Sequence, residues 1–143
     1  MAIRSVLHTA ISTLDLDASV AFWCEFGFTE TRRWEWPAGV EVINALLDLP
    51  DSSARAALLE GHGTGIELFE FSRPDPGREP EQVHRLGYTH MAFAVDDLDA
   101  ELARMGELGM EFWADPVTDG SGRKMVYGRS PEGFVIELVQ PAA

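Results

Sequence analysis

Cysteine is almost absent from this chain, with Cys24 alone among 143 residues. A single cysteine excludes an intrachain disulfide and a zinc site built on paired cysteines. The lack of a disulfide framework fits a reducing compartment, so we expect a cytoplasmic protein. Cys24 lies in the apolar stretch "AFWCEFGF", and we expect it to be a small buried side chain of a helix.

Positive charge is also scarce, because Lys and Arg number 11 against 24 Asp and Glu, a net charge of −13. Such a surface repels phosphate backbones and anionic lipids, so neither nucleic acid nor a membrane surface is an expected partner. No apolar run approaches the ~20 residues of a membrane span, and "MAIRSVLHTAIS" lacks the apolar run of a signal peptide. Hydrophobic residues make up 45% of the chain, enough for the core of one domain.

What the chain does contain is an internal repeat. Residues 8–28 align with residues 90–110 at a constant offset of 82, without a gap. The identities between the copies include His8 with His90, Ala10 with Ala92, Asp15 with Asp97, Leu16 with Leu98, Asp17 with Asp99, Ala18 with Ala100, and Gly27 with Gly109. Chance does not give so many matches in register, so we infer two copies of one structural unit.

Each copy has the pattern of a strand, a helix and three further strands. Asp15 and Asp97 are suited to cap helix N-termini, and Gly27 and Gly109 to end those helices with a positive φ. Candidate strands follow at 29–36, 54–60 and 65–71 in the first copy, and at 110–114, 123–129 and 133–139 in the second, where "SPEG" predicts a β-turn.

The predicted organisation is one α+β domain of two tandem βαβββ modules. Module one spans 1–71, a proline-rich and charged linker spans 72–86, and module two spans 87–143. Residues 37–53 interrupt the first copy, and their apolar middle predicts a short helix.

The strand pattern leaves an ionisable side chain on the face opposite the large aliphatic residues in each of four strands. These residues are His8, Glu67, His90 and Glu137. A carboxylate in the middle of a strand is costly to bury unless it is paired, protonated or bound to a metal. Imidazole and carboxylate are common ligands of first-row divalent metals, so the set predicts a metal site. The alternative is a pair of His–Glu bridges between strands.

The chain resembles the vicinal oxygen chelate superfamily, which includes glyoxalase I, methylmalonyl-CoA epimerase, extradiol dioxygenases and bleomycin resistance proteins. The resemblance rests on "VLHTAISTLDLDASVAFWCEFGF", "GIELFEF", "YTHMAFAVDDLDA" and "GFVIELV", and it covers nearly the whole chain. It implies paired βαβββ modules whose curled mixed sheets surround a metal. It also implies that His8, Glu67, His90 and Glu137 are the four ligands, nearest the glyoxalase I-like branch.

The resemblance favours an enzyme, a metal-dependent lyase or isomerase that moves a proton on a small α-hydroxy or α-oxo carbonyl compound. Glu137 is then the first candidate for the catalytic base, with Glu67 on the opposite face of the substrate. The ion would be Zn, Ni, Co, Mn or Fe, since the ligands do not discriminate well among them. Two alternatives are an Fe(II) extradiol-type dioxygenase and a non-catalytic binding protein for an aromatic toxin or antibiotic.

Several features of the resemblance concern the substrate and the assembly. Glu67 is followed by "LFEFSRPDP" and not by the Thr and the Asn-Trp-Gly segment of glyoxalase I, so glutathione is left open as a cosubstrate. The small-molecule pocket is predicted to be lined by aromatic residues, with an arginine for an anionic group: Trp34, Trp36, Phe69, Phe71, Trp113 and Arg123. The alternative is core or dimer packing for the aromatic residues and a solvated hairpin loop for Arg123. Open sheet edges and the resemblance both predict a homodimer, in which each site can draw ligands from two chains.

Overall fold

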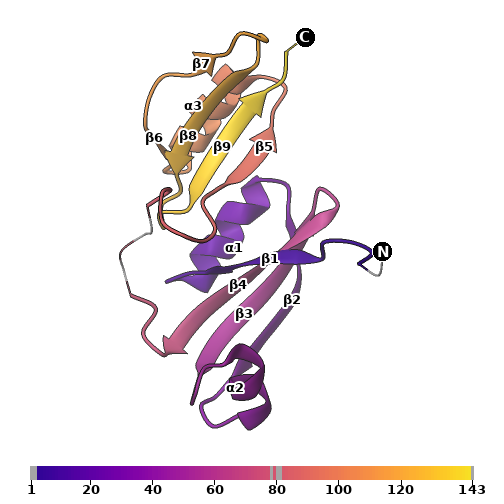
Figure 1. Cartoon of the computed structure of the whole chain (residues 1–143), viewed down its shortest axis with the longest axis vertical. Helices are drawn as coiled ribbons and strands as arrows, with labels where there is room; N and C mark the ends of the chain where they lie inside the picture. The colour runs from indigo at the N-terminus through magenta and orange to yellow at the C-terminus, as the bar shows by residue number, and fades with distance from the viewer. Residues whose placement is uncertain (1–2, 78, 80–81, 143) are drawn as a thin grey trace. The chain divides into compact units, whose positions relative to one another are not determined.

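Residues 3–77, 79 and 82–142 are described by the computed structural model, in which the chain forms two units (Figure 1). The units are Met1–Arg78 and Glu79–Ala143, and each is described by itself. Their boundary falls inside the segment 72–86 that the sequence predicts as a linker.

The first unit holds one curled mixed sheet of four strands with two helices. Its elements are β1 (His8–Ser12), α1 (Leu16–Glu25), β2 (Thr29–Trp36), α2 (Glu41–Leu47), β3 (Ser53–Gly61) and β4 (Thr64–Arg73). The strand order is β1-β4-β3-β2, and only the β1–β4 pairing is parallel. The short helix expected within 37–53 is therefore present as α2. Pairing of Ser53 with Arg73 carries β4 two residues into the predicted linker.

The second unit repeats this plan with five strands and one helix. Its elements are β5 (Met91–Ala94), α3 (Leu98–Glu107), β6 (Glu111–Phe112), β7 (Val117–Thr118), β8 (Lys124–Arg129) and β9 (Val135–Gln140). The strand order is β5-β9-β8-β6, β7 also pairs with β8, and β5–β9 is parallel. The α+β class and the two βαβββ modules are confirmed.

The helix ends follow from the repeated residues. The side chain of Asp15 accepts a hydrogen bond from the backbone N–H of Ala18, and Asp97 does the same with Ala100, each at 3.0 Å. Gly27 and Gly109 have φ of 84° and 86°, a conformation that costs glycine little. The predicted caps and stops are thus confirmed in both copies.

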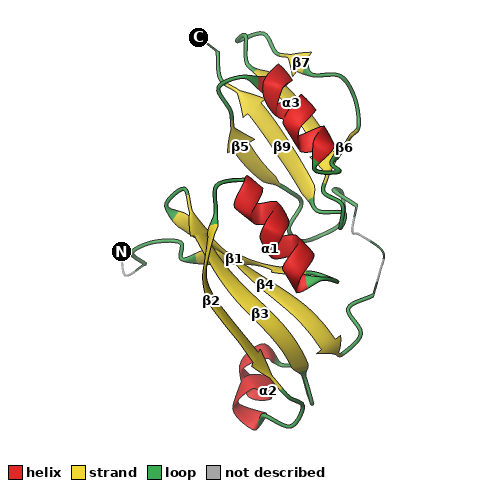
Figure 2. Ribbon diagram, turned by 180° about the vertical axis from the view of Figure 1, so that it is seen from behind, coloured by secondary structure: helices red, strands yellow, loops and turns green. Residues whose placement is uncertain are grey.

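The core of each unit lies between the sheet and the long helix, as Figure 2 shows for α1 and α3. Ile66 and Leu68 of β4 are fully buried on this side, and Ile136 and Leu138 of β9 are at most 1% exposed. Their strand neighbours Glu67 and Glu137 therefore point to the other face of each sheet. This alternation is what positions the candidate site.

Cys24 is exposed, so the expectation that it is buried is wrong. The buried face of α1 is formed by Leu16, Ser19, Val20 and Trp23, whose spacing leaves Cys24 beside that stripe. No helix of the described residues is long and apolar enough to cross a membrane.

Candidate functional site

The structure joins His8 and Glu67, which we call the first pair. Nε2 of His8 lies 3.3 Å from Oε2 of Glu67. The contact follows from the parallel β1–β4 register, in which Ala10 is opposite Glu67 and His8 is two residues earlier on the same face. The Glu67 side chain is 18% exposed and that of His8 is 38% exposed, so the pair is reachable from solvent.

His90 and Glu137 form the second pair in the same way. Nε2 of His90 lies 3.4 Å from Oε2 of Glu137. Ala92 is opposite Glu137 in the parallel β5–β9 register, so His90 again stands two residues before the partner of the glutamate. The two copies of the fold thus present the same donor atoms with the same spacing.

The spacing within each pair suits two ligands of one cation. Charge-assisted N–H···O contacts are shorter, about 2.7–2.9 Å. Two ligands that bind one cation at about 2.0–2.1 Å lie about 2.9 Å apart at a right angle and about 3.4 Å apart at the tetrahedral angle. The observed 3.3 and 3.4 Å fall in this range. The residues therefore fit a divalent metal in donor type and in separation.

Each unit supplies two of the four predicted ligands. Within residues 3–77, 79 and 82–142, no three His, Cys, Asp or Glu side chains gather closely enough to hold a metal ion.

Two residues with hydroxyl groups lie beside the second pair, and the sequence analysis did not identify either of them. Oγ1 of Thr89 is hydrogen-bonded to Nδ1 of His90 at 2.8 Å. Tyr127 lies directly opposite Glu137 in the β8–β9 pairing, near enough for the carboxylate to act on the pKa of its hydroxyl. Burial, followed by the negative charge of Glu137, raises the pKa of Tyr127, so its hydroxyl stays protonated at neutral pH.

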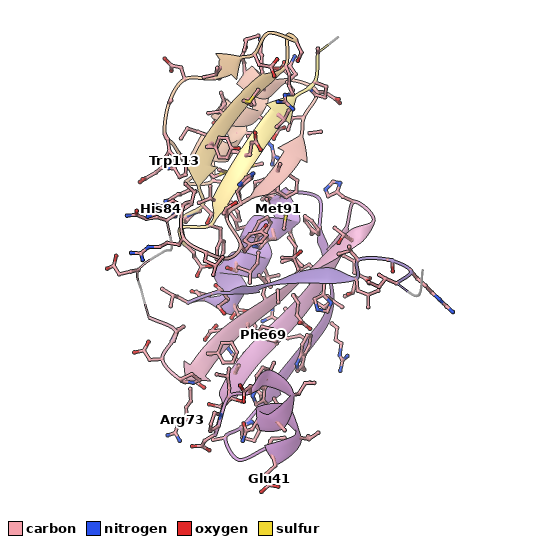
Figure 3. All side chains as sticks on the ribbon, in the orientation of Figure 1. Glu41, Phe69, Arg73, His84, Met91 and Trp113 are labelled. Carbon is pink, nitrogen blue, oxygen red and sulfur yellow. The ribbon has the colours of Figure 1, made fainter. Side chains whose placement is uncertain are left out.

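An aromatic row continues from the second pair. The rings of His90 and Tyr127 meet edge to face at 5.1 Å, and Trp113 stacks on Tyr127 at 6.1 Å. The guanidinium of Arg129 covers Trp113 at 5.5 Å. Trp113 is 48% exposed and is labelled in Figure 3, so it offers a flat apolar surface beside Glu137.

The first pair has different neighbours. Leu7 precedes His8 where Thr89 precedes His90, and Leu58 is opposite Glu67 where Tyr127 is opposite Glu137. The first pair therefore has hydrocarbon side chains at the two positions where the second pair has hydroxyl groups.

The other predicted pocket residues are placed as follows. Phe69, which is labelled in Figure 3, and Phe71 share the face of Glu67, but together with Trp34 they pack against a buried cluster that includes Trp36. Arg32 covers Trp34 at 5.0 Å. Nε of Arg123 donates to Oδ2 of Asp119 at 3.2 Å within the loop before β8. No ligand contact tests the proposed pocket lining, which remains a prediction.

A register argument could have brought Tyr127 close to Glu137 but not opposite it. Counting outward from the predicted turn "SPEG" pairs residue 127 with residue 136. The observed hydrogen bond from the Ser130 N–H to the Phe134 carbonyl shifts the register by one residue, which places Tyr127 opposite Glu137. Thr89 carried no such signal, because a threonine beside a histidine need not face its ring.

Known proteins are similar to this chain in sequence and in fold. A 2-epi-5-epi-valiolone epimerase of Actinomyces sp. is 32% identical over 143 residues, 94% of this chain and 78% of that protein. A probable lactoylglutathione lyase of Synechocystis is 24% identical over 96% of each chain. The crystal structure of a glyoxalase family protein from Bacillus cereus covers 100% of this chain and 99% of its own, with a TM-score of 0.84 and 24% identity, and so supports the fold.

The family assignment rests on more than these single relatives. Residues 5–138 match the family described as the Glyoxalase/Bleomycin resistance protein/Dioxygenase superfamily. This span contains both His–Glu pairs and both copies of the βαβββ plan. Members of this superfamily act on or bind small molecules, and many use a divalent metal. The chain belongs to the Glyoxalase/Bleomycin resistance protein/Dioxygenase superfamily.

Proposed function

We propose that this protein is a metal-dependent lyase or isomerase that transfers a proton on a small α-hydroxy or α-oxo carbonyl compound. His8, Glu67, His90 and Glu137 hold the metal in this proposal. The observation that carries it is the repeated His–Glu pair, at equivalent registers and with donor separations of 3.3 and 3.4 Å. An epimerase and a lactoylglutathione lyase among the relatives support the reaction class.

A divalent ion held by these four residues supplies Lewis-acid stabilisation to negative charge that develops on a substrate oxygen. The side chains do the rest of the work. The carboxylate of Glu137 takes the proton from the carbon beside the carbonyl group, and the electron pair of that C–H bond moves toward the carbonyl oxygen. Return of a proton to that carbon from the side of Glu67 gives the epimer, and return to the neighbouring carbon gives the isomer.

Small-molecule access fits the partial exposure of the pairs. Both glutamates are mostly buried, at 18% and 14% exposure, so water around them is limited. The exposed ring of Trp113 lies on the same face and can stack on a planar or ring-shaped substrate.

We also propose a homodimer, in which one His–Glu pair of a site can come from one chain and the other pair from the second chain. β1 and β5 are edge strands, and Val6 and Leu7 beside β1 are 71% and 75% exposed in the single chain. A second copy would cover this edge and its apolar side chains. Light scattering tests this point: a monomer that still binds one metal ion would refute a site shared between chains.

The reaction is tested by exchange with solvent deuterium. Metal-stripped protein is reloaded with Co²⁺, Ni²⁺, Zn²⁺, Mn²⁺ or Fe²⁺ and incubated in D₂O with 2-epi-5-epi-valiolone, or with the hemithioacetal of methylglyoxal and glutathione. We expect deuterium in the product at the carbon beside the carbonyl, with the Glu137→Gln variant as control. Absence of exchange with every compound would contradict the proposal. Oxygen consumption with a catechol would favour the dioxygenase instead, and tight antibiotic binding without turnover would favour the binding protein.

A further inference from the structure

We propose that Thr89 and Tyr127 are positioning residues that orient the second pair, so that the second unit contributes more to metal affinity than the first. This inference rests on the proposed function, because it assumes that His90 and Glu137 bind a metal. It assigns roles to two side chains that touch the pair without being ligands themselves.

Thr89 controls the proton on the His90 ring. A histidine that binds a cation through Nε2 must carry its proton on Nδ1. Oγ1 of Thr89 lies 2.8 Å from Nδ1 and can accept that proton in a hydrogen bond. This contact stabilises the tautomer with a free Nε2 lone pair, and it fixes the rotation of the ring toward Glu137.

Tyr127 holds the carboxylate of Glu137 from the neighbouring strand. A phenol hydroxyl can donate to the carboxylate that lies opposite it across the strands, and the carboxylate keeps further lone pairs for a cation. The phenol ring is itself fixed, since it meets the edge of His90 at 5.1 Å and stacks on Trp113 at 6.1 Å. One side chain therefore contacts both members of the second pair.

The first unit provides an internal comparison for this role. Its pair has the same backbone register and nearly the same donor separation, but Leu7 and Leu58 occupy the positions of Thr89 and Tyr127. Hydrocarbon cannot fix a tautomer or hold a carboxylate. The first pair must therefore lose more conformational freedom when it binds a metal, which weakens its contribution.

The test measures Co²⁺ affinity by visible absorption in the full-length protein, with Thr89→Val and Tyr127→Phe as the test variants. Thr89→Val keeps the shape and removes the hydroxyl, and Tyr127→Phe keeps the stacked ring. We expect each variant to bind Co²⁺ about 10–100-fold more weakly, the usual cost of losing a group that orients a metal ligand. Thr89→Ser should restore most of the affinity. Tyr88→Phe is the matched control, since Tyr88 is the only other tyrosine and is 59% exposed.

A second readout separates positioning from general stability. In the Zn²⁺-loaded protein labelled with ¹⁵N-histidine, the Nδ1–H signal of His90 should be protected from exchange, and Thr89→Val should remove that protection. Wild-type affinity in both test variants, or failure of Thr89→Ser to restore binding, would overturn the inference and leave the proposed function standing. A wild-type protein that binds no Co²⁺ would overturn the proposed function and this inference with it.

Discussion

The two units place the same His–Glu pair in different surroundings. Both have glutamates in the middle of the last strand, opposite the same position of a parallel edge strand. The first pair is flanked by Leu7 and Leu58, and the second by Thr89 and Tyr127. The repeated backbone thus determines where the pair stands, whereas the side chains that flank it differ between the units.

The aromatic residues differ between the units as well. In the first unit, Phe69, Phe71 and the α2 side chains of Ile43 and Leu47 all pack against a buried cluster that includes Trp36. The described part of the second unit has no helix at the matching position, and Trp113 keeps 48% exposure. The aromatic group of the first unit thus packs in a core, whereas Trp113 of the second unit stays half exposed.

Replacement of a histidine in either pair should have the largest effect. We expect His8→Ala and His90→Ala each to remove most of the metal, because one site needs both pairs. The proposed positioning by Thr89 and Tyr127 predicts a greater loss for His90→Ala. Metal content after purification and dialysis is the measurement. Half of the wild-type content remaining in each variant would show two independent sites.

Replacement of each glutamate should show which of the two pairs supplies the catalytic base. Glu137→Gln keeps the shape and one ligand oxygen but removes the base, so turnover should fall by ~10²–10⁴-fold with much less loss of metal. Glu67→Gln is the comparison. Turnover and metal content are measured on the same preparations. If Glu137→Gln retains nearly full turnover while Glu67→Gln does not, Glu67 is the base.

Shortening a core side chain should destabilise the two units equally, because each glutamate stands on a strand whose opposite face is packed in the core. Leu68 and Leu138 occupy matching positions behind the glutamates and are at most 1% exposed. Leu68→Ala and Leu138→Ala should each lower the free energy of unfolding by about 2–5 kcal/mol. Chemical denaturation of the metal-free protein measures this. A loss below 1 kcal/mol for one variant would mean that its unit can refill the space.

The helix caps provide a smaller matched test. Asp15→Ala and Asp97→Ala each remove one capping hydrogen bond of 3.0 Å. Each should cost about 0.5–2 kcal/mol of stability, with Asp15→Asn and Asp97→Asn as variants that can still cap. Equal stability of the alanine and asparagine variants in thermal unfolding would show that the cap hydrogen bond contributes nothing.

Much of the fold was predictable because it depends on local patterns. The offset of 82 between His8 and His90, the caps at Asp15 and Asp97, and the alternation around Glu67 and Glu137 are all visible in the sequence. Each one reflects a rule that acts over a few residues: helix capping, positive φ at glycine, and strand parity.

The surroundings of the pairs were not predicted, because they depend on contacts between elements. Packing of α2 against the buried cluster that includes Trp36 requires the helix to fold back on the face opposite α1. The contact of Tyr127 with Glu137 requires the β8–β9 register, and the contact of Thr89 with His90 requires particular side-chain rotamers. Cys24 was misplaced because the apolar stretch around it is longer than the buried stripe of α1.

The smallest expected effect concerns charges on the first unit that lie away from its pair. Arg33 donates to Asp17 and, at 2.7 Å, to Glu30, and these hydrogen bonds lower the pKa of both carboxyl groups. A pKa lowered by folding stabilises the protein above the unfolded value and is without effect below the folded one. Arg33→Gln should therefore destabilise the protein at pH 7, but only slightly, since the groups are exposed. The difference in stability from wild type should shrink as the pH falls through the ordinary range of these carboxyls, from about 4.5 downward. Salt at 1 M should reduce this difference further. Urea unfolding at pH 7 and pH 3 checks this, and an equal difference at both pH values would show that Arg33 acts through packing and not through its charge.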